Sequence, residues 1–249
     1  MITCNNLSVS YGKKNVLNNL SFTVKEGELA VIIGPNGSGK TTLFRALSGS
    51  LPYSGKLLIH GTDIRTIRSS QRAKLLSVMP QLLPQPDLTV RDLIAFGRYP
   101  FTGFSGILNA ADWRIVDDTI AKMGLESLSC SQVNKISGGE CRKAFLAMAL
   151  AQKAPLLLAD EPCANLDPEY CKYILSLLKA QKEAGDTILC ILHDMNQAFE
   201  IADRILALDH GQLIFDGTPA HAAQAKIPET LFSLHPIRGT DGSGNSVIL

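Results

Sequence analysis

A glycine-rich stretch, residues 34–41, constrains the fold of this chain more than any other part of the sequence. It follows the apolar run 29–33, typical of a buried strand, and precedes residues 42–47, which have the pattern of an opening helix. Glycines let consecutive backbone N–H groups turn towards one point, and the helix adds the positive end of its dipole. The spacing therefore predicts a phosphate-binding loop (P-loop) in which Lys40 reaches the β- and γ-phosphates and Thr41 offers a hydroxyl to Mg²⁺. The alternative, a glycine-rich turn without a ligand, is less favoured because a strand and a helix flank the stretch.

Length, charge and cysteine spacing exclude several classes of protein. The chain has 249 residues, enough for one large α/β domain or a domain with a subdomain. Its formal net charge of +1 gives no electrostatic reason to expect a nucleic-acid partner. No run approaches the roughly twenty apolar residues of a spanning helix, and the first residues lack the basic and apolar regions of a signal peptide, so we expect a soluble, cytosolic chain. The six cysteines and five histidines show no metal-ligand spacing, which predicts reduced thiols and no structural metal.

Two extended segments at the start of the chain predict an antiparallel portion. Residues 3–11 and 16–24 read as short strands joined by a turn. We expect this piece to lie beside a parallel core. Tyr11 ends the first strand, where its ring could stack on an adenine base or simply cap a hairpin, and the sequence favours neither.

The middle of the chain predicts a helical insert. Residues 84–150 show no strand pattern, and residues 89–96 and 112–123 read as helices, the first with Thr89 as its cap. The insert closes with Ser137, two glycines and Glu140 at the start of a strong helix. This arrangement repeats the logic of the P-loop, although a simple helix cap is the favoured explanation when it is taken alone.

Polar side chains follow three of the predicted core strands. Gln81 comes after the strand 75–79, and ligand groups gather at the carboxyl edge of an open α/β sheet. The strand from residue 156 ends in Asp160, suited to hold Mg²⁺, and Glu161, suited to orient and deprotonate a water. His193 follows the strand 187–192, where it could contact a γ-phosphate. A loop amide, a solvated edge and a structural histidine are the respective alternatives.

In this order the signals resemble the ATP-binding cassette (ABC) family over essentially the entire chain. Residues 34–41 correspond to the Walker A motif, Gln81 to the Q-loop, residues 137–140 to the signature and residues 156–160 to Walker B. Glu161 falls on the catalytic glutamate, residues 165–167 on the D-loop, His193 on the switch histidine and Tyr11 on the adenine-stacking aromatic.

The resemblance implies an ATPase with a P-loop NTPase core and a mostly parallel sheet, an N-terminal antiparallel β subdomain and an inserted α-helical subdomain. It assigns residues 1–83 and 151–238 to the catalytic core, 84–150 to the helical signature subdomain and 239–249 to a loose tail. Catalysis falls to Glu161, His193 and Gln81, and Mg²⁺ to Thr41, Gln81 and Asp160. The implied ATP-binding positions are Tyr11, Gly34, Pro35, Asn36, Gly37, Ser38, Gly39, Lys40, Thr41, Thr42, Ser137, Gly138, Gly139, Glu140 and Asp167.

The resemblance also implies partners. In that family two cassettes pack head to tail, so that each ATP lies between the P-loop of one copy and the signature of the other. Hydrolysis then separates the copies, and the region of Gln81 and residues 82–101 transmits the motion to a membrane permease. We therefore expect a peripheral subunit on the cytoplasmic face of the inner or plasma membrane, served indirectly by an external substrate-binding protein and without nucleic acid.

Residues 97–100, followed by a loop and Asp112, are similar to the subgroup that drives importers of iron–siderophores, haem and cobalamin, although Phe101 stands where histidine is common. A zinc or manganese importer is the alternative. A soluble cassette without a permease is a further alternative, less favoured because it usually has paired cassettes or a long coiled coil, and a small-molecule kinase would not explain Ser137 and its glycines.

The motifs also depart from the family pattern at three positions, Cys141, Cys163 and Asn165. None of them removes a phosphate or metal ligand. We hypothesise that the Cys141 thiol makes the ATPase sensitive to alkylation, and a buried, inert cysteine is the competing interpretation.

Overall fold

The computed structural model describes residues 2–103, 106–164, 166–232, 238–240 and 246–248. The chain divides into two compact units. One contains residues 1–64 and 189–249, and the other contains residues 65–188. Each unit is built around strands whose apolar side chains are buried, and each carries part of the motif set predicted from the sequence.

The first unit contains the predicted antiparallel portion. Its four strands lie in the order β2 (Lys14–Val24), β1 (Ile2–Tyr11), β4 (Ser54–Ile59) and β5 (Thr62–Asp63), with neighbouring strands antiparallel. In β1 the side chains of Ile2, Cys4, Leu7 and Val9 are buried. The hairpin turn between β1 and β2 lies at residues 12–13, within the turn predicted for residues 12–15.

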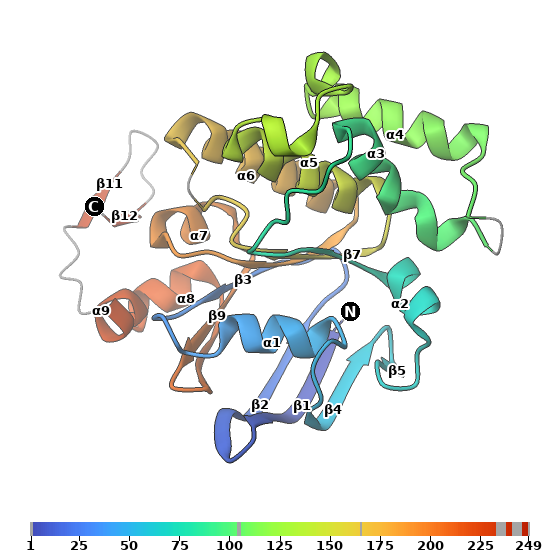
Figure 1. The fold of residues 1–249 in the computed structure, drawn as a ribbon. Helices are drawn as coiled ribbons and strands as arrows, with labels where there is room; N and C mark the ends of the chain where they lie inside the picture. The colour runs from blue at the N-terminus through green and yellow to red at the C-terminus, as the bar shows by residue number, and fades with distance from the viewer. Residues whose placement is uncertain (1, 104–105, 165, 233–237, 241–245, 249) are drawn as a thin grey trace. The chain divides into compact units, whose positions relative to one another are not determined.

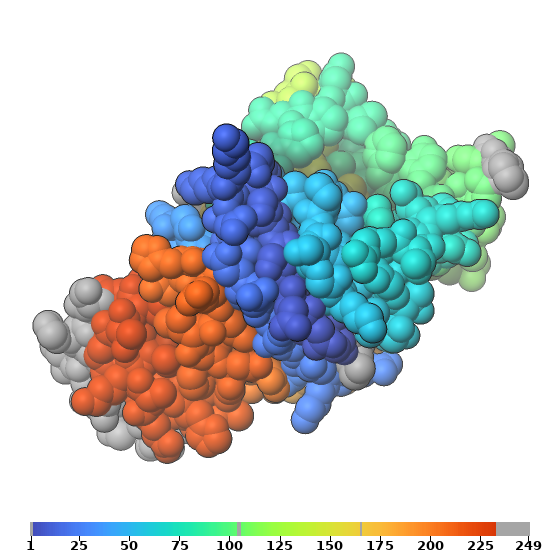
Figure 2. Space-filling model, turned by 90° about the horizontal axis from the view of Figure 1, so that it is seen from below, coloured from blue at the N-terminus to red at the C-terminus, as the bar shows by residue number. Residues whose placement is uncertain are grey.

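A parallel pair forms the rest of this unit's framework. β3 (Leu29–Ile33) is buried at every residue and runs parallel to β9 (Arg204–Asp209), while β10 (Gln212–Gly217) pairs antiparallel with β9. The P-loop leads from β3 into α1 (Lys40–Leu47). Figure 2 shows the N-terminal strands, in dark blue, bordering the orange segment of β9 and β10, and the amide of Asn18 donates to the carbonyl of Gly211 at 2.8 Å.

Short helices complete the first unit, namely α7 (Met195–Ile201), α8 (Pro219–Gln224) and α9 (Ile227–Phe232). The turn residues Thr218 and Pro228 predict short helices after them, which agrees with α8 and α9, whereas the sequence does not predict α7. Within the segment expected to be a loose tail, β11 (Arg238–Thr240) pairs antiparallel with β12 (Ser246–Ile248), so these residues form regular structure.

The second unit combines a parallel strand pair with most of the helices (Figure 1). β6 (Leu76–Met79) and β7 (Leu156–Asp160) run parallel, with Met79 opposite Ala159. The helices are α2 (Ser69–Leu75), α3 (Val90–Ala95), α4 (Ala110–Lys122), α5 (Gly138–Ala151) and α6 (Pro168–Glu183), and the 3-10 helices are η1 (Phe96–Phe101), η2 (Glu126–Leu128) and η3 (Val133–Lys135).

The helices from α3 to α5 fall within the stretch predicted to be helical, and these three pack against one another. Thr89 caps α3 as the sequence predicts, and Asn109 forms a capping box with Asp112 at the start of α4. Side chains that cap a helix satisfy amides that have no partner within it, which fixes where the helix begins. That residues 84–150 form a separate subdomain stays a prediction.

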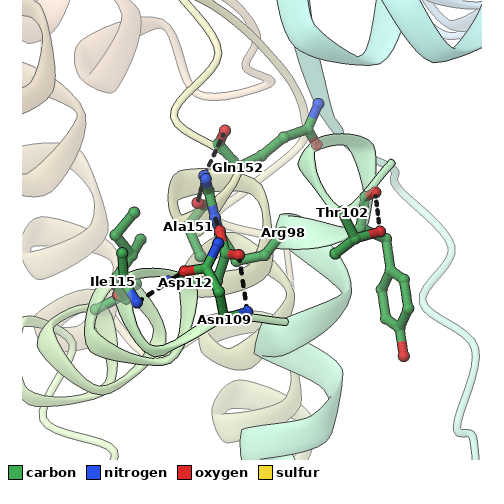
Figure 3. Close-up of polar contacts among 10 residues, drawn as sticks. Arg98, Thr102, Asn109, Asp112, Ile115, Ala151 and Gln152 are labelled. Carbon is green, nitrogen blue, oxygen red and sulfur yellow. Dashed lines mark hydrogen bonds and ion pairs between the residues drawn. The ribbon is translucent and has the colours of Figure 1, made fainter. Parts of the chain in front are cut away.

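A buried arginine ties this helical region together (Figure 3). The Nε atom of Arg98 donates to Asp112 at 3.1 Å, and its Nη1 atom donates to the carbonyl of Ala151 at 2.9 Å, near the end of α5. The neighbouring Gly97 lies against α5, because a Cβ atom there would be 2.3 Å from the carbonyl oxygen of Met148. Residues 97–98 therefore join η1, α4 and α5.

β8 (Thr187–Ile191) spans the boundary between the two units. At its start the amide of Thr187 donates to the carbonyl of Pro155, and after its end the amide of Leu192 donates to the carbonyl of Ile32. The parallel pairs β3–β9 and β6–β7, with helices between the strands, confirm the predicted α/β fold class. Over the part of the chain that the structure describes, none of the helices has the length and apolar content that crossing a bilayer requires.

Candidate active site

The P-loop adopts a conformation that requires its glycines. A Cβ atom on Gly34 would lie 2.1 Å from the carbonyl oxygen of Leu208 in β9. Gly39 has φ of +103°, a conformation that L side chains rarely adopt, and a Cβ atom there would meet Leu17 at 2.5 Å. Residues of β9 and β2 therefore pack closely against the P-loop. The turn between β9 and β10 supports it as well, since the amide of Gly211 donates to the carbonyl of Ser38 at 3.1 Å.

Two polar side chains of the loop fit an anion. The Nζ atom of Lys40 is buried and donates to the carbonyls of Gly34 and Pro35, at 2.7 and 3.0 Å. The Oγ atom of Ser38 is buried and has no hydrogen-bond partner among the described residues. No side chain caps the start of α1, and its next residues, Thr41 and Thr42, are half-buried. A phosphate would supply the acceptors that the serine and the helix start lack.

Two more predicted residues lie in the first unit. His193 follows β8 and is exposed. Because the amide of Leu192 bonds to Ile32, His193 leaves the strand beside the end of β3, where the P-loop begins. Tyr11 ends β1 with its side chain 43% exposed, so its ring is accessible to a base. Its role in stacking stays a prediction.

The second unit carries the predicted acidic pair. Asp160 is the last residue of β7 and is buried, as the sequence predicts for a carboxylate at a strand tip. Glu161 follows with φ of +53° and is half-buried. A non-glycine residue in the left-handed region is uncommon, and the strain is tolerated only where surrounding contacts hold it.

Strand register brings Gln81 to the same edge as this pair. Met79 is opposite Ala159 in the parallel pair β6–β7, so Gln81 and Glu161, each two residues further on, leave their strands side by side. A residue that the sequence did not predict joins them. Arg142 of α5 donates from Nη1 to the carbonyl of Glu161 at 2.8 Å and from Nη2 to that of Gln81 at 3.5 Å.

The signature segment, residues 137–140, forms the start of α5. Ser137 caps the helix by accepting from the amide of Glu140, and the Glu140 carboxylate accepts from the Ser137 amide at 2.8 Å. This capping box is the simple cap that the sequence allowed, and it satisfies the amides of Ser137 and Glu140 within the chain. A Cβ atom on Gly138 would have nothing within 4 Å, whereas one on Gly139 would be 3.2 Å from Leu166.

The first unit thus carries a glycine-rich loop, and the second carries two strands followed by polar residues and a glycine-bearing helix start. Comparison with known proteins agrees with these motifs. The sequence profile of the family described as ABC transporter matches residues 17–164. The chain belongs to this ABC transporter family. It is an ABC ATPase, and the predicted family is confirmed.

Relatives match over nearly the whole chain. A petrobactin import ATP-binding protein of Bacillus anthracis is 38% identical over 237 residues, which cover 94% of this chain and 87% of that protein. The ferric enterobactin transport ATP-binding protein of Escherichia coli is 34% identical, over 94% of this chain and 90% of that protein. A solved dimeric bacterial ABC transporter cassette superposes with a TM-score of 0.80 at 25% identity, over 88% of this chain and 99% of that one.

The D-loop of this ABC ATPase is only partly described. Asn165 lies outside the described residues. Asp167 caps α6 by accepting from the amide of Tyr170 at 2.9 Å, so it has a structural role in this chain. Its predicted contact with nucleotide stays a prediction.

The structure favours the inert interpretation of Cys141. Its side chain is buried in α5, and burial raises the pKa of the thiol, with the nearby charge of Arg142 opposing that rise. The thiolate is the reactive form of a cysteine. Burial therefore reduces the reactivity of Cys141 in two ways, because it shields the sulfur from reagents and because it raises the pKa of the thiol.

Proposed function

We propose that this ABC ATPase powers the uptake of iron–siderophore complexes, as one of two copies that bind ATP between them. Both relatives described above are named for the import or transport of such compounds, and they match nearly the full chain. That match is the observation that carries the proposal, and it favours siderophore import over the alternative of zinc or manganese import.

ATP binding is assigned to the P-loop. We infer that the phosphates accept from the amides of residues 36–41, from the Ser38 hydroxyl and from Lys40, whose Nζ atom now contacts two loop carbonyls. Tyr11 would stack on the adenine ring. For Mg²⁺ the proposed ligands are the Thr41 hydroxyl, the Asp160 carboxylate and the Gln81 amide oxygen, which are the oxygen donors that this ion prefers. When bound, the ion would neutralise charge on the β- and γ-phosphates.

Hydrolysis is assigned to Glu161. Its carboxylate would orient a water and take the proton as that water attacks the γ-phosphate. Gln81 leaves its strand beside Glu161, which supports a role in placing the same water. His193 would contact the γ-phosphate and register its loss.

A second copy would complete each site. Gly138 is exposed, and among the described residues none comes within 4 Å of the place where its Cβ atom would be. Packing within the described chain would allow a side chain at this position. A glycine here therefore supports a close approach by another molecule, namely the phosphates held by the P-loop of the partner copy. The amides and dipole of α5 would then stabilise charge on them.

A membrane permease is the proposed second partner. Five large apolar side chains between Gln81 and Asp112 are exposed by about a third or more of their surface. They are Leu82, Phe96, Tyr99, Phe101 and Ile107. Apolar side chains gathered on one stretch favour a protein contact. With such a partner the chain would lie at the cytoplasmic face of the membrane, and an external substrate-binding protein would deliver the cargo.

Uptake of a radioactive ferric siderophore tests the function. Cells that lack this chain should lose ATP-dependent uptake, the unaltered chain should restore it, and a Glu161→Gln chain should not. Co-purification with a polytopic membrane subunit is expected in the same cells. Uptake that persists without the chain, or a lone monomer that phosphorylates a metabolite, would contradict the proposal.

A further inference from the structure

Arg142 connects the signature helix to the hydrolytic residues of the same unit. Its side chain is 8% exposed, and its guanidinium donates to two backbone carbonyls, those of Glu161 and Gln81. Both carbonyls belong to loops that leave the adjacent strands β6 and β7. One buried cation on α5 therefore contacts both the proposed base and the proposed water-placing residue through their main chains.

The bond to Glu161 helps to hold that residue's backbone, together with the Ala164 amide, which donates to the same carbonyl at 3.1 Å. Glu161 has φ of +53°, which the surrounding contacts must hold. A charged donor at 2.8 Å from its carbonyl is a strong contact of this kind. Burial lowers the pKa of Arg142, and the charge of the nearby Glu161 carboxylate opposes that fall.

The same helix begins with the signature. Ser137 caps α5, and Arg142 lies five residues further along. α5 is one continuous helix that is buried along most of its length. A displacement of the whole helix would also displace the guanidinium of Arg142, and with it the two carbonyls that it contacts.

We propose that Arg142 is a positioning residue through which the nucleotide at one site of the dimer controls hydrolysis at the other site. The inference rests on the proposed head-to-tail function. In that dimer Ser137 contacts the nucleotide held by the partner copy, whereas Glu161 acts on the nucleotide held by its own P-loop. Arg142 connects the two within one chain, so α5 conveys occupancy of the first site to the base of the second.

Lys143 supplies a matched control. It is the next residue of α5, is equally buried and carries the same charge, but its ammonium lies over the rings of Tyr170 and Tyr173 in α6, at 5.3 and 5.0 Å. Its contacts therefore involve neither of the loops that Arg142 holds.

The test compares Arg142→Met, Arg142→Lys and Lys143→Met in the full chain. ATPase rate is measured against ATP concentration, and binding is measured with a fluorescent ATP analogue. Arg142→Met keeps the apolar stem of the side chain but removes its hydrogen-bond donors. We therefore expect kcat to fall about tenfold and the Hill coefficient for ATP to fall to 1. The affinity for nucleotide should not change. Arg142→Lys should recover part of kcat but not the cooperativity, because an ammonium cannot bridge both carbonyls as a planar guanidinium does. Lys143→Met should keep the cooperativity of the unaltered chain.

Each outcome decides the inference. If Arg142→Met does not fold, Arg142→Lys replaces it, and an unchanged Hill coefficient in that variant overturns the inference. Equal loss of cooperativity in Lys143→Met also overturns it, because the effect would then be one of packing. A different result would refute the proposed dimer itself: the unaltered chain would hydrolyse ATP without cooperativity, and Ser137→Ala would have the normal rate. If the unaltered chain is cooperative and Ser137→Ala is slow, an unchanged Hill coefficient in the Arg142 variants refutes only the role of Arg142.

Discussion

The two glycine-bearing helix starts of this protein, at α1 and at α5, differ in what their own chain provides. At α1 the first unit crowds the loop, so that a Cβ atom on Gly34 would strike the backbone of Leu208, and no side chain caps the helix. At α5 a capping box closes the helix start, and Gly138 has open space around it. The first start is shaped by its own unit and has no side-chain cap, whereas the second has a side-chain cap and is not crowded at Gly138.

The difference assigns separate tasks to the two units. The P-loop carries the proposed phosphate site of one chain. The signature segment is a capped helix start, and the proposed dimer gives its exposed Gly138 a role. Lys40 lies in the first unit and Glu161 lies in the second, so the proposed roles in binding and in hydrolysis are tested at separate positions.

The largest effect is expected at Glu161. Glu161→Gln should keep ATP affinity and lower hydrolysis by about 10²- to 10⁴-fold, because the amide cannot accept the proton of the attacking water. The variant should also accumulate as an ATP-bound dimer. Phosphate release and size-exclusion chromatography with ATP measure the two effects. Normal turnover would end the role of Glu161 as base.

Lys40→Ala should remove binding in the first unit. Loss of its charge-assisted bonds to phosphate should weaken ATP affinity by about 10- to 100-fold. Titration with a fluorescent ATP analogue measures this change, and Lys56→Ala, at an exposed lysine of β4, is the control. Full affinity in the Lys40 variant would contradict the assignment of the loop.

Gly34→Ala and Gly138→Ala test the comparison directly. The first should lower the free energy of unfolding by about 1–3 kcal/mol, since the new methyl group overlaps a backbone carbonyl. The second should change it by no more than about 0.5 kcal/mol, yet should impair ATP-dependent dimer formation. Urea unfolding and chromatography with ATP measure the two properties. Equal destabilisation by both would remove the distinction between the two helix starts.

Alkylation probes how well α5 is packed into its unit. Cys130 is exposed, whereas Cys141 is buried and has a raised pKa. Iodoacetamide should therefore modify Cys130 at least about tenfold faster, with little loss of ATPase activity. Mass spectrometry at timed intervals follows both sites. Equally fast labelling at Cys141, with inactivation, would revive the hypothesis of an alkylation-sensitive thiol.

The smallest effect is expected for an exposed ion pair between α3 and α4. Arg91 donates from Nε to Asp117 at 2.8 Å, and this bond lowers the pKa of Asp117. The ionised Asp117 carboxylate contributes to the free energy of unfolding at pH values above its unfolded pKa of about 4. This contribution is lost as the pH falls through the lower pKa of the folded state. Asp117→Asn should therefore cost less than about 0.5 kcal/mol at pH 7 and nothing near pH 2. Urea unfolding at both pH values measures it, and an equal cost at both would show that charge is not the cause.

Local patterns predicted most of the elements that carry the site. The apolar run before Gly34, the strand ending at Asp160 and the cap at Ser137 are each encoded within a few neighbouring residues, and the structure has all three. The short helices α2 and α7 were not predicted. Helices of seven residues have little propensity of their own and form where tertiary packing stabilises them.

The roles of Arg142 and Gly211 could not be predicted. The contact of Arg142 with Gln81 spans 61 residues of sequence, and Gly211 donates to Ser38 across a still longer separation. No local pattern encodes which loop a buried side chain will meet. For the same reason the sequence left Cys141 open, because a cysteine's burial depends on the elements that pack around it.

By itself the sequence determined the family, the order of the motifs and the residue types at each strand tip, because phosphate and magnesium chemistry restrict these to short, recognisable spacings. Only the tertiary structure decided which glycine is needed by its own chain and which is not, and which arginine holds the main chain of Glu161. These depend on the atoms that close packing brings within a few ångströms from distant parts of the chain.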